Sequence, residues 1–130
     1  MTPAEETARR LARGRALFNR GSYFEAHEVW EEAWLSEEGE ARRILQGLIQ
    51  IAAAGHKATV QKQAAGCVRL LEAGLARLAV ASEDFAGVAL ARFRRGVKET
   101  LREARRWERG ERRSLGRSAF ALLEEASKKR

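Results

Sequence analysis

The sequence predicts an all-α protein, a single-domain bundle of five or six helices that spans residues 1–130. Three observations favour this class. Ala, Leu, Arg and Glu, which are good helix formers, dominate the composition. Apolar residues recur at the three- and four-residue spacing of helices. The only proline is Pro3, and strand-rich domains usually need more turn residues than this chain supplies. With 45% hydrophobic and 33% charged residues, the composition is globular, and the chain can bury a core without a disulfide or metal.

The first helix is predicted from its capping residues. Thr2, Pro3 and Glu5 supply a capping threonine, a proline at the first helical position and a glutamate three residues after the cap. The helix should run to about Arg20, because Gly21 accepts the left-handed conformation that ends helices.

The second and third helices follow after short breaks. Ser22 and Glu25 form a second capping box, and the helix should reach residues 34–35. Residues 36–39 are a polar break. The third helix is expected over residues 40–61, and its wide apolar circumference is typical of a central helix.

Apolar spacing predicts the remaining elements. A fourth helix should include residues 67–78, and residues 81–87 should form the longest loop. A fifth helix follows over residues 90–107, before a charged break at 109–113. Ser114 can then cap a sixth helix.

Charge, hydropathy and cysteine content limit the classes of protein to which the chain can belong. The net charge is +7, and residues 91–130 account for the excess, with fourteen Lys/Arg against six Asp/Glu. The N-terminus lacks the apolar segment of a secretory signal, and the apolar stretch at 48–54 is too short to cross a bilayer. Cys67 is alone, so no disulfide framework is expected. We therefore expect a cytoplasmic protein that is not in a membrane.

The second helix places polar side chains among its aromatic residues. At about 100° per residue, His27 and Glu31 fall within the arc of Tyr23, Trp30 and Trp34. An ionised carboxylate without partners is very costly in a core. Glu31 should therefore be paired, protonated, bound to a metal or open to a water-filled cleft.

The second and third helices should be antiparallel neighbours, because a short break joins them. His56 is then expected near His27, and Gln46 or Gln50 near Glu31. This juxtaposition predicts one polar cluster between the two helices. The expected members are Tyr23, His27, Glu31, Trp34, Gln46, Gln50 and His56.

Two runs carry a resemblance to a known family. The run FNRGSYFEAHEVWEEAW at 18–34, followed by RRILQGLIQIAAAGH at 42–56, resembles domain-of-unknown-function family 309. The resemblance covers about residues 18–78 and implies an all-helical fold with no assigned activity. The chain departs from the family at 60–63, where the family often has a Gly-Asn turn. The positions that match the characteristic ones are His27, Glu28, Glu31, Trp34, Gln46, Gln50 and His56.

One hypothesis for the cluster is a metal-dependent hydrolase. His27 to Glu31 reads HExxE, so both residues could ligate a divalent metal from one helix. His56 could supply a third ligand from the next helix, and Glu28 could act as the base on a bound water. The string alone is weak, because Glu and His pairs arise easily in helices.

Two other hypotheses use the same residues. In the first, His27, Glu31 and Gln50, with Arg43, form a buried hydrogen-bond network that fixes the helix register. In the second, the residues line a small-molecule pocket. Its apolar contacts and polar anchors would come from Tyr23, Trp30, Trp34, His27, Glu31 and Gln50.

The basic C-terminal third allows a fourth hypothesis, nucleic-acid or acidic-partner binding. Its arginines are interleaved with glutamates, which favours a self-paired, solvated face. No named nucleic-acid motif is present. The sequence leaves homo-oligomerisation open. The arginines concerned are Arg92, Arg94, Arg95, Arg102, Arg105, Arg106, Arg109, Arg112, Arg113 and Arg117.

Overall fold

A computed structural model describes residues 1–79, 81 and 84–126. Within these residues the protein has five α-helices and one short antiparallel hairpin, so the predicted all-α class is confirmed. The elements are α1 (Pro3–Asn19), α2 (Tyr23–Leu35), α3 (Gly39–Thr59), α4 (Ala64–Leu78), β1 (Asp84–Phe85), β2 (Val88–Ala89), α5 (Leu90–Glu108) and a 3-10 turn (Arg117–Ala119).

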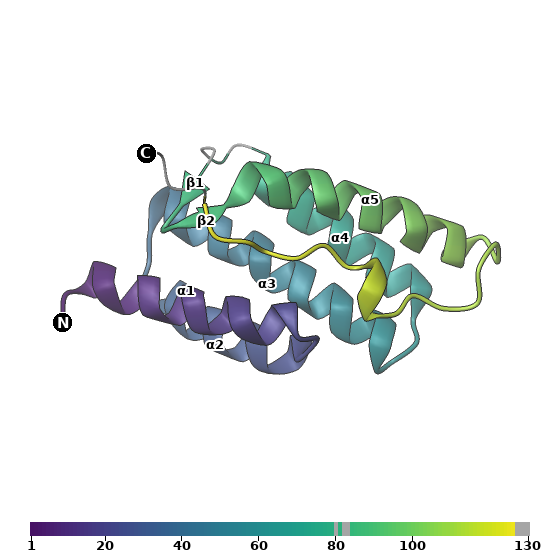
Figure 1. Ribbon diagram of the computed structural model, residues 1–130, viewed down its shortest axis with the longest axis horizontal. Helices are drawn as coiled ribbons and strands as arrows, with labels where there is room; N and C mark the ends of the chain where they lie inside the picture. Colours follow the sequence, from purple (N-terminus) through teal and green to yellow (C-terminus); the bar gives the residue numbers. More distant parts are fainter. Residues whose placement is uncertain (80, 82–83, 127–130) are drawn as a thin grey trace.

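The helix α3 lies in the middle of the bundle (Figure 1). It packs against α2 on one side and against α4 on the other, while α1 packs on α2 and α5 packs on α4. The core lies between these layers. Its largest fully buried side chains are Trp30, Phe18, Phe93, Leu11, Ile44, Leu45, Leu48, Ile51, Leu71, Leu78, Leu90 and Leu115.

None of the helices in the described residues combines the length and the apolar character that crossing a bilayer requires. The cytoplasmic location expected from the sequence stays a prediction.

The start of α1 confirms its predicted cap. Thr2 Oγ1 accepts a hydrogen bond from the Glu5 amide at 3.1 Å, and Glu5 Oε1 accepts one from the Thr2 amide at 2.9 Å. Hydrogen bonding of the Glu5 carboxylate, first to the Thr2 amide and then to the Thr2 side chain, lowers the pKa of the carboxyl. Gly21 has a φ of +86°, as the predicted helix end requires. The second capping box is wrong, because the Ser22 hydroxyl accepts a hydrogen bond from Arg20 Nε at 3.4 Å instead of capping α2.

The predicted long loop at 81–87 contains a hairpin in its described part; residues 82–83 lie outside the described residues. Strands β1 and β2 pair with Asp84 opposite Ala89. Ala86 and Gly87, between the strands, have φ values of 46° and 84°. Two positive φ values at the centre of a two-residue loop match the twist of a hairpin.

The predicted sixth helix is absent from the described residues, and an extended C-terminal strap (residues 114–126) takes its place. It runs back along the bundle from the end of α5 to the hairpin (Figure 1). The backbone of the strap forms hydrogen bonds with the side chains of Asn19 and Thr100 and with the backbone amide of Ala89. The strap's carbonyls that accept these bonds are therefore not free to form the hydrogen bonds of a helix. The strap's buried side chains are Leu115, Phe120 and Leu123.

Candidate functional site

A small pocket of about 180 Å³ opens where the start of α2 faces the end of α3. The antiparallel packing of two consecutive helices brings these ends together. Close approach is possible because Gly55 has no side chain: a Cβ there would lie 2.5 Å from Cγ of the Tyr23 ring. The lining residues are Phe24, His27, Ala53, His56, Lys57 and Gln61.

Phe24 lies close to two imidazoles in this pocket. Its ring centroid is 6.4 Å from that of His27, with the rings nearly parallel at 15°, and 5.5 Å from that of His56. The Phe24 side chain is 53% exposed, which is high for an aromatic residue beside a core. An open aromatic surface close to two imidazoles is therefore the main feature of the pocket.

The polar side chains of the pocket are two imidazoles, one ammonium and the Gln61 amide. His27 Nε2 lies 3.7 Å from Glu31 Oε2, while its Nδ1 is buried and has no hydrogen-bond partner among the described residues. Lys57 Nζ donates to Gln63 Oε1 at 2.9 Å, which leaves two of its three donors for other acceptors. None of the lining residues is a carboxylate.

The sequence prediction that Glu31 points inward is wrong: its side chain is 48% exposed. The buried residues of α2 are Tyr23, Ala26, Trp30 and Ala33. At 100° per residue, Glu31 lies about 120° from the centre of that face. The prediction weighted the bulky aromatic residues, whereas the fully buried Ala26 and Ala33 move the centre of the buried face away from Glu31.

The three residues expected to hold a metal do not form a metal site. Among the described residues, no group of three or more His, Cys, Asp or Glu side chains is arranged to hold a metal ion. His27 and His56 both lie close to Phe24, and Glu31 lies on the solvent side of His27. Glu28, the expected base, is exposed and is not among the lining residues. The geometry therefore does not support the hydrolase hypothesis.

The predicted buried network is not formed either. His27 and Glu31 at 3.7 Å are too far apart for a hydrogen bond. Gln50 lies about 120° around α3 from His56 and lines a shallow surface against α4 with Arg43 and Arg77. The Oε1 atom of Gln50 is buried without a partner among the described residues. The central position of α3 turns its polar residues towards two different neighbours.

The other predicted cluster members lie apart from the pocket. Tyr23 is buried, with its ring against Phe18 at a centroid distance of 5.2 Å. Trp34 is half-buried under the Arg42 guanidinium, which lies 3.9 Å from the ring centroid. Gln46 is half-buried. The structure thus brings together His27 and His56, and distributes the remaining members over α2 and α3.

The arginines of the basic C-terminal third are largely occupied by partners within the chain. Eight of the ten bind carboxylates or backbone carbonyls in the described residues, which leaves fewer groups for phosphates. Nucleic-acid or acidic-partner binding, and homo-oligomerisation, stay predictions. The paired arginines are Arg92, Arg94, Arg102, Arg105, Arg106, Arg109, Arg112 and Arg117.

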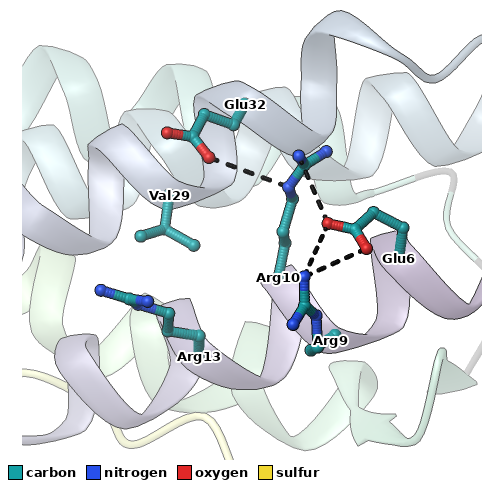
Figure 2. A pocket seen from close by; sticks show the side chains of 6 residues that line it. All are labelled: Glu6, Arg9, Arg10, Arg13, Val29 and Glu32. Carbon is teal, nitrogen blue, oxygen red and sulfur yellow. Dashed lines mark hydrogen bonds and ion pairs between the residues drawn. The ribbon is translucent and has the colours of Figure 1, made fainter.

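A second hollow, between α1 and α2, was missed by sequence reasoning (Figure 2). It has a volume of about 440 Å³. The signal was available, because four charged residues of α1 recur at the spacing that places side chains on one helix face. The lining residues are Glu6, Arg9, Arg10, Arg13, Val29 and Glu32.

The chain matches the model of a known protein family. Residues 11–70 match the model of the family described as Domain of unknown function (DUF309). The match confirms the resemblance that the two sequence runs predicted, and it includes the residues of α2 and α3 that line the pocket. No protein with a curated description matches the chain.

Proposed function

Starting from a chain whose residues 11–70 match a family of unknown function, we propose that this protein binds a small planar anion in the pocket between α2 and α3. The observation that carries the proposal is the composition of the pocket lining. Two imidazoles and one ammonium line the same pocket as an exposed phenyl ring, and the lining contains no carboxylate. Few placed polar groups around an apolar wall are what small-molecule sites generally use.

Each part of the ligand has a matching group. The Phe24 ring and the His56 imidazole offer flat faces on which a planar body can stack. Lys57, held by Gln63, and the imidazole nitrogens offer donors to an anionic group. Glu31 lies outside the lining, with its Oε2 3.7 Å from Nε2 of His27.

The volume limits the size of the ligand. Sites for drug-sized ligands generally have volumes of about 300–1,000 Å³. The pocket here, at about 180 Å³, fits a single ring with one substituent. A monocyclic carboxylate such as benzoate is therefore the simplest probe.

The test is an NMR titration of the labelled protein with benzoate, benzamide and benzylammonium, which share a ring and differ in charge. We expect saturable shifts at Phe24, His27 and His56 with benzoate, weaker shifts with benzamide and none with benzylammonium. Lys57→Met should weaken benzoate binding about tenfold, because a charge-assisted hydrogen bond contributes about 1.5–3 kcal/mol. Phe24→Ala should weaken binding of both benzoate and benzamide.

Glu28→Gln is the matched control, since Glu28 neighbours His27 in sequence but is exposed and outside the lining. It should leave benzoate binding unchanged. Phe24 is half exposed, so its variant should keep the folded spectrum. Equal binding of all three probes, or shifts that Lys57→Met leaves unaltered, would contradict the proposal.

A further inference from the structure

The groove between α1 and α2 has a different chemistry from the pocket. Glu6, Arg9, Arg10 and Arg13 of α1 lie on one face of that helix, opposite Val29 and Glu32 of α2. Three guanidinium groups and two carboxylates line the groove, so its formal charge is +1. Figure 2 shows Arg9 and Arg10 together beside Glu6 and Arg13 apart from them, with Val29 between Glu32 and Arg13.

Two of the three arginines are held in place by carboxylates. Arg9 Nη2 bonds both oxygens of Glu6, at 3.0 and 3.1 Å. Arg10 Nη2 lies 3.3 Å from Glu6 Oε1, and Arg10 Nε lies 3.8 Å from Glu32 Oε2. A guanidinium has five N–H donors, so each arginine keeps donors that these pairs do not use. The glutamates therefore orient the arginines without exhausting them.

Arg13 differs from its neighbours. It has no ion pair within the described residues, although it lines the same groove as two carboxylates. Its guanidinium lies on the opposite side of the hollow from Glu32 and beside Val29 (Figure 2). The groove therefore has one guanidinium free of ion pairs within the described residues, beside two that carboxylates hold in place.

We propose that this groove binds the phosphate group of a small phosphorylated molecule. The planar fork of arginine matches the oxygens of phosphate, and charge-assisted bonds to it are strong. Arg13 supplies the free charge, Arg9 and Arg10 supply oriented donors, and the Val29 side chain contacts an apolar part of the ligand. The site is separate from the proposed anion pocket, because Val29 and Glu32 lie about 140° around α2 from Phe24 and His27.

The test uses inorganic phosphate as the probe, titrated into the labelled full-length chain at constant ionic strength, because salt screens exposed charges. We expect saturable shifts at residues 6–13 and 29–32. Arg13→Gln should weaken binding about tenfold, in line with the loss of a charged hydrogen bond. Glu32→Gln should tighten binding about threefold, because it raises the formal charge of the groove and releases Arg10 Nε.

The opposite signs of these two effects separate a binding site from a structural ion-pair network. In a network alone, both variants would change stability slightly and neither would change phosphate binding. Arg102→Gln is the matched control, because Arg102 is exposed on α5 and pairs with Glu99 three residues away. Its binding should equal that of the wild type.

Three results would overturn the proposal. The first is that Arg13→Gln and Arg102→Gln bind phosphate equally. The second is that Glu32→Gln weakens binding. The third is that shifts appear only with duplex DNA and fall on α5, which would assign the basic charge to a nucleic-acid surface. If benzoate failed to bind, the phosphate proposal would still stand, since the two ligands contact different sides of α2.

Discussion

The helices α1, α2 and α3 approach one another closely at glycines. The C-terminal strap buries three apolar side chains in the same core, and side chains of α1 and α5 also form hydrogen bonds with the strap's backbone. A Cβ at Gly14 would overlap the Trp30 indole, and one at Gly55 would lie 2.5 Å from the Tyr23 ring. In the strap, Asn19 binds both the amide and the carbonyl of Leu123, at 2.8 and 2.9 Å.

The difference has consequences for how each region tolerates change. Helix contacts that depend on the absence of a side chain fail when volume is added, because protein interiors are close-packed. A segment held by polar groups fails when a donor or acceptor is removed, because the remaining partner is then left unsatisfied. The two regions should therefore respond to opposite kinds of substitution.

Gly14→Ala should have the largest effect. The added methyl group would displace Trp30, which is fully buried and donates from Nε1 to the Leu11 carbonyl at 3.2 Å. Overpacking of a core costs about 1–3 kcal/mol, and loss of the indole hydrogen bond adds about 1 kcal/mol. The gain in helix propensity offsets about 1 kcal/mol of this. We expect a net loss of about 1–3 kcal/mol, measured by urea unfolding.

The matched control is Gly116→Ala, in the strap. Gly116 has an extended backbone, and a Cβ there would meet nothing within 4 Å. The free energy of unfolding should change by less than about 0.5 kcal/mol. If both variants lost the same free energy of unfolding, the helix contacts would be no more sensitive to added volume than the strap is.

Asn19→Ala should have the next largest effect, on the strap alone. It leaves the amide of Leu123 without its partner and leaves the carbonyl only the long bond from Arg15 Nη1 at 3.5 Å, at an expected cost of about 2 kcal/mol. Hydrogen exchange should accelerate at the Leu123 amide while the amides of α3 keep their protection. Ser118→Ala, an exposed change in the strap, should alter neither rate. Uniform acceleration across α3 and the strap would mean that the strap has no separate stability.

Thr100→Val should have a smaller effect of the same kind. The Thr100 hydroxyl donates to the Ala119 carbonyl at 2.8 Å and accepts from the Ala121 amide at 3.2 Å. Valine keeps the shape and removes both bonds, so we expect a loss of about 1 kcal/mol by urea unfolding. Exchange should accelerate at the Ala121 amide in particular. An unchanged rate at that amide would contradict the assigned role of the hydroxyl.

The same contrast explains which parts of the fold the sequence predicts. Spacing and caps predict the five helices closely, because burial of an apolar face and the cap at Thr2 are local properties of the sequence. The strap is not predictable in this way. Its backbone partners, Asn19 and Thr100, are far away in sequence, and Leu115 and Phe120 are compatible with a helix until those contacts are known.

The candidate site, like the fold, has features that the sequence predicts and features that it does not. The antiparallel pairing of α2 and α3 correctly places His27 and His56 around one pocket, because the short break between the helices dictates which ends meet. The orientation of Glu31 depends on where the centre of the buried face lies, and Ala26 and Ala33 set it. Small residues weigh little in a hydrophobic pattern, yet they decide which side of a helix approaches its neighbour.

Tyr23 contacts both the helix bundle and the C-terminal strap. The pH dependence of unfolding in a Tyr23→Phe variant therefore tests how well the two regions pack around its ring. Its ring lies over Gly55 and 5.2 Å from the Phe120 ring of the strap. Burial raises the pKa of the Tyr23 hydroxyl from 10.0 to about 12. Because the folded pKa is the higher one, the protein's stability is complete below pH 10 and falls as pH rises towards 12. Burial of the Cys67 thiol raises its pKa from 9.0 to about 12, and adds a loss that begins near pH 9.

Tyr23→Phe should therefore be nearly neutral at pH 7 and should reduce the stability loss between pH 10 and pH 12. A shift of one pKa unit corresponds to about 1.4 kcal/mol, so the reduction should be on the order of 2 kcal/mol at the upper end. Urea unfolding at intervals from pH 7 to 12 measures it, and Cys67→Ala isolates the contribution that starts near pH 9. If Tyr23→Phe follows the wild-type profile, the hydroxyl is accessible to solvent. The strap would then not exclude water from the Tyr23 side of α2.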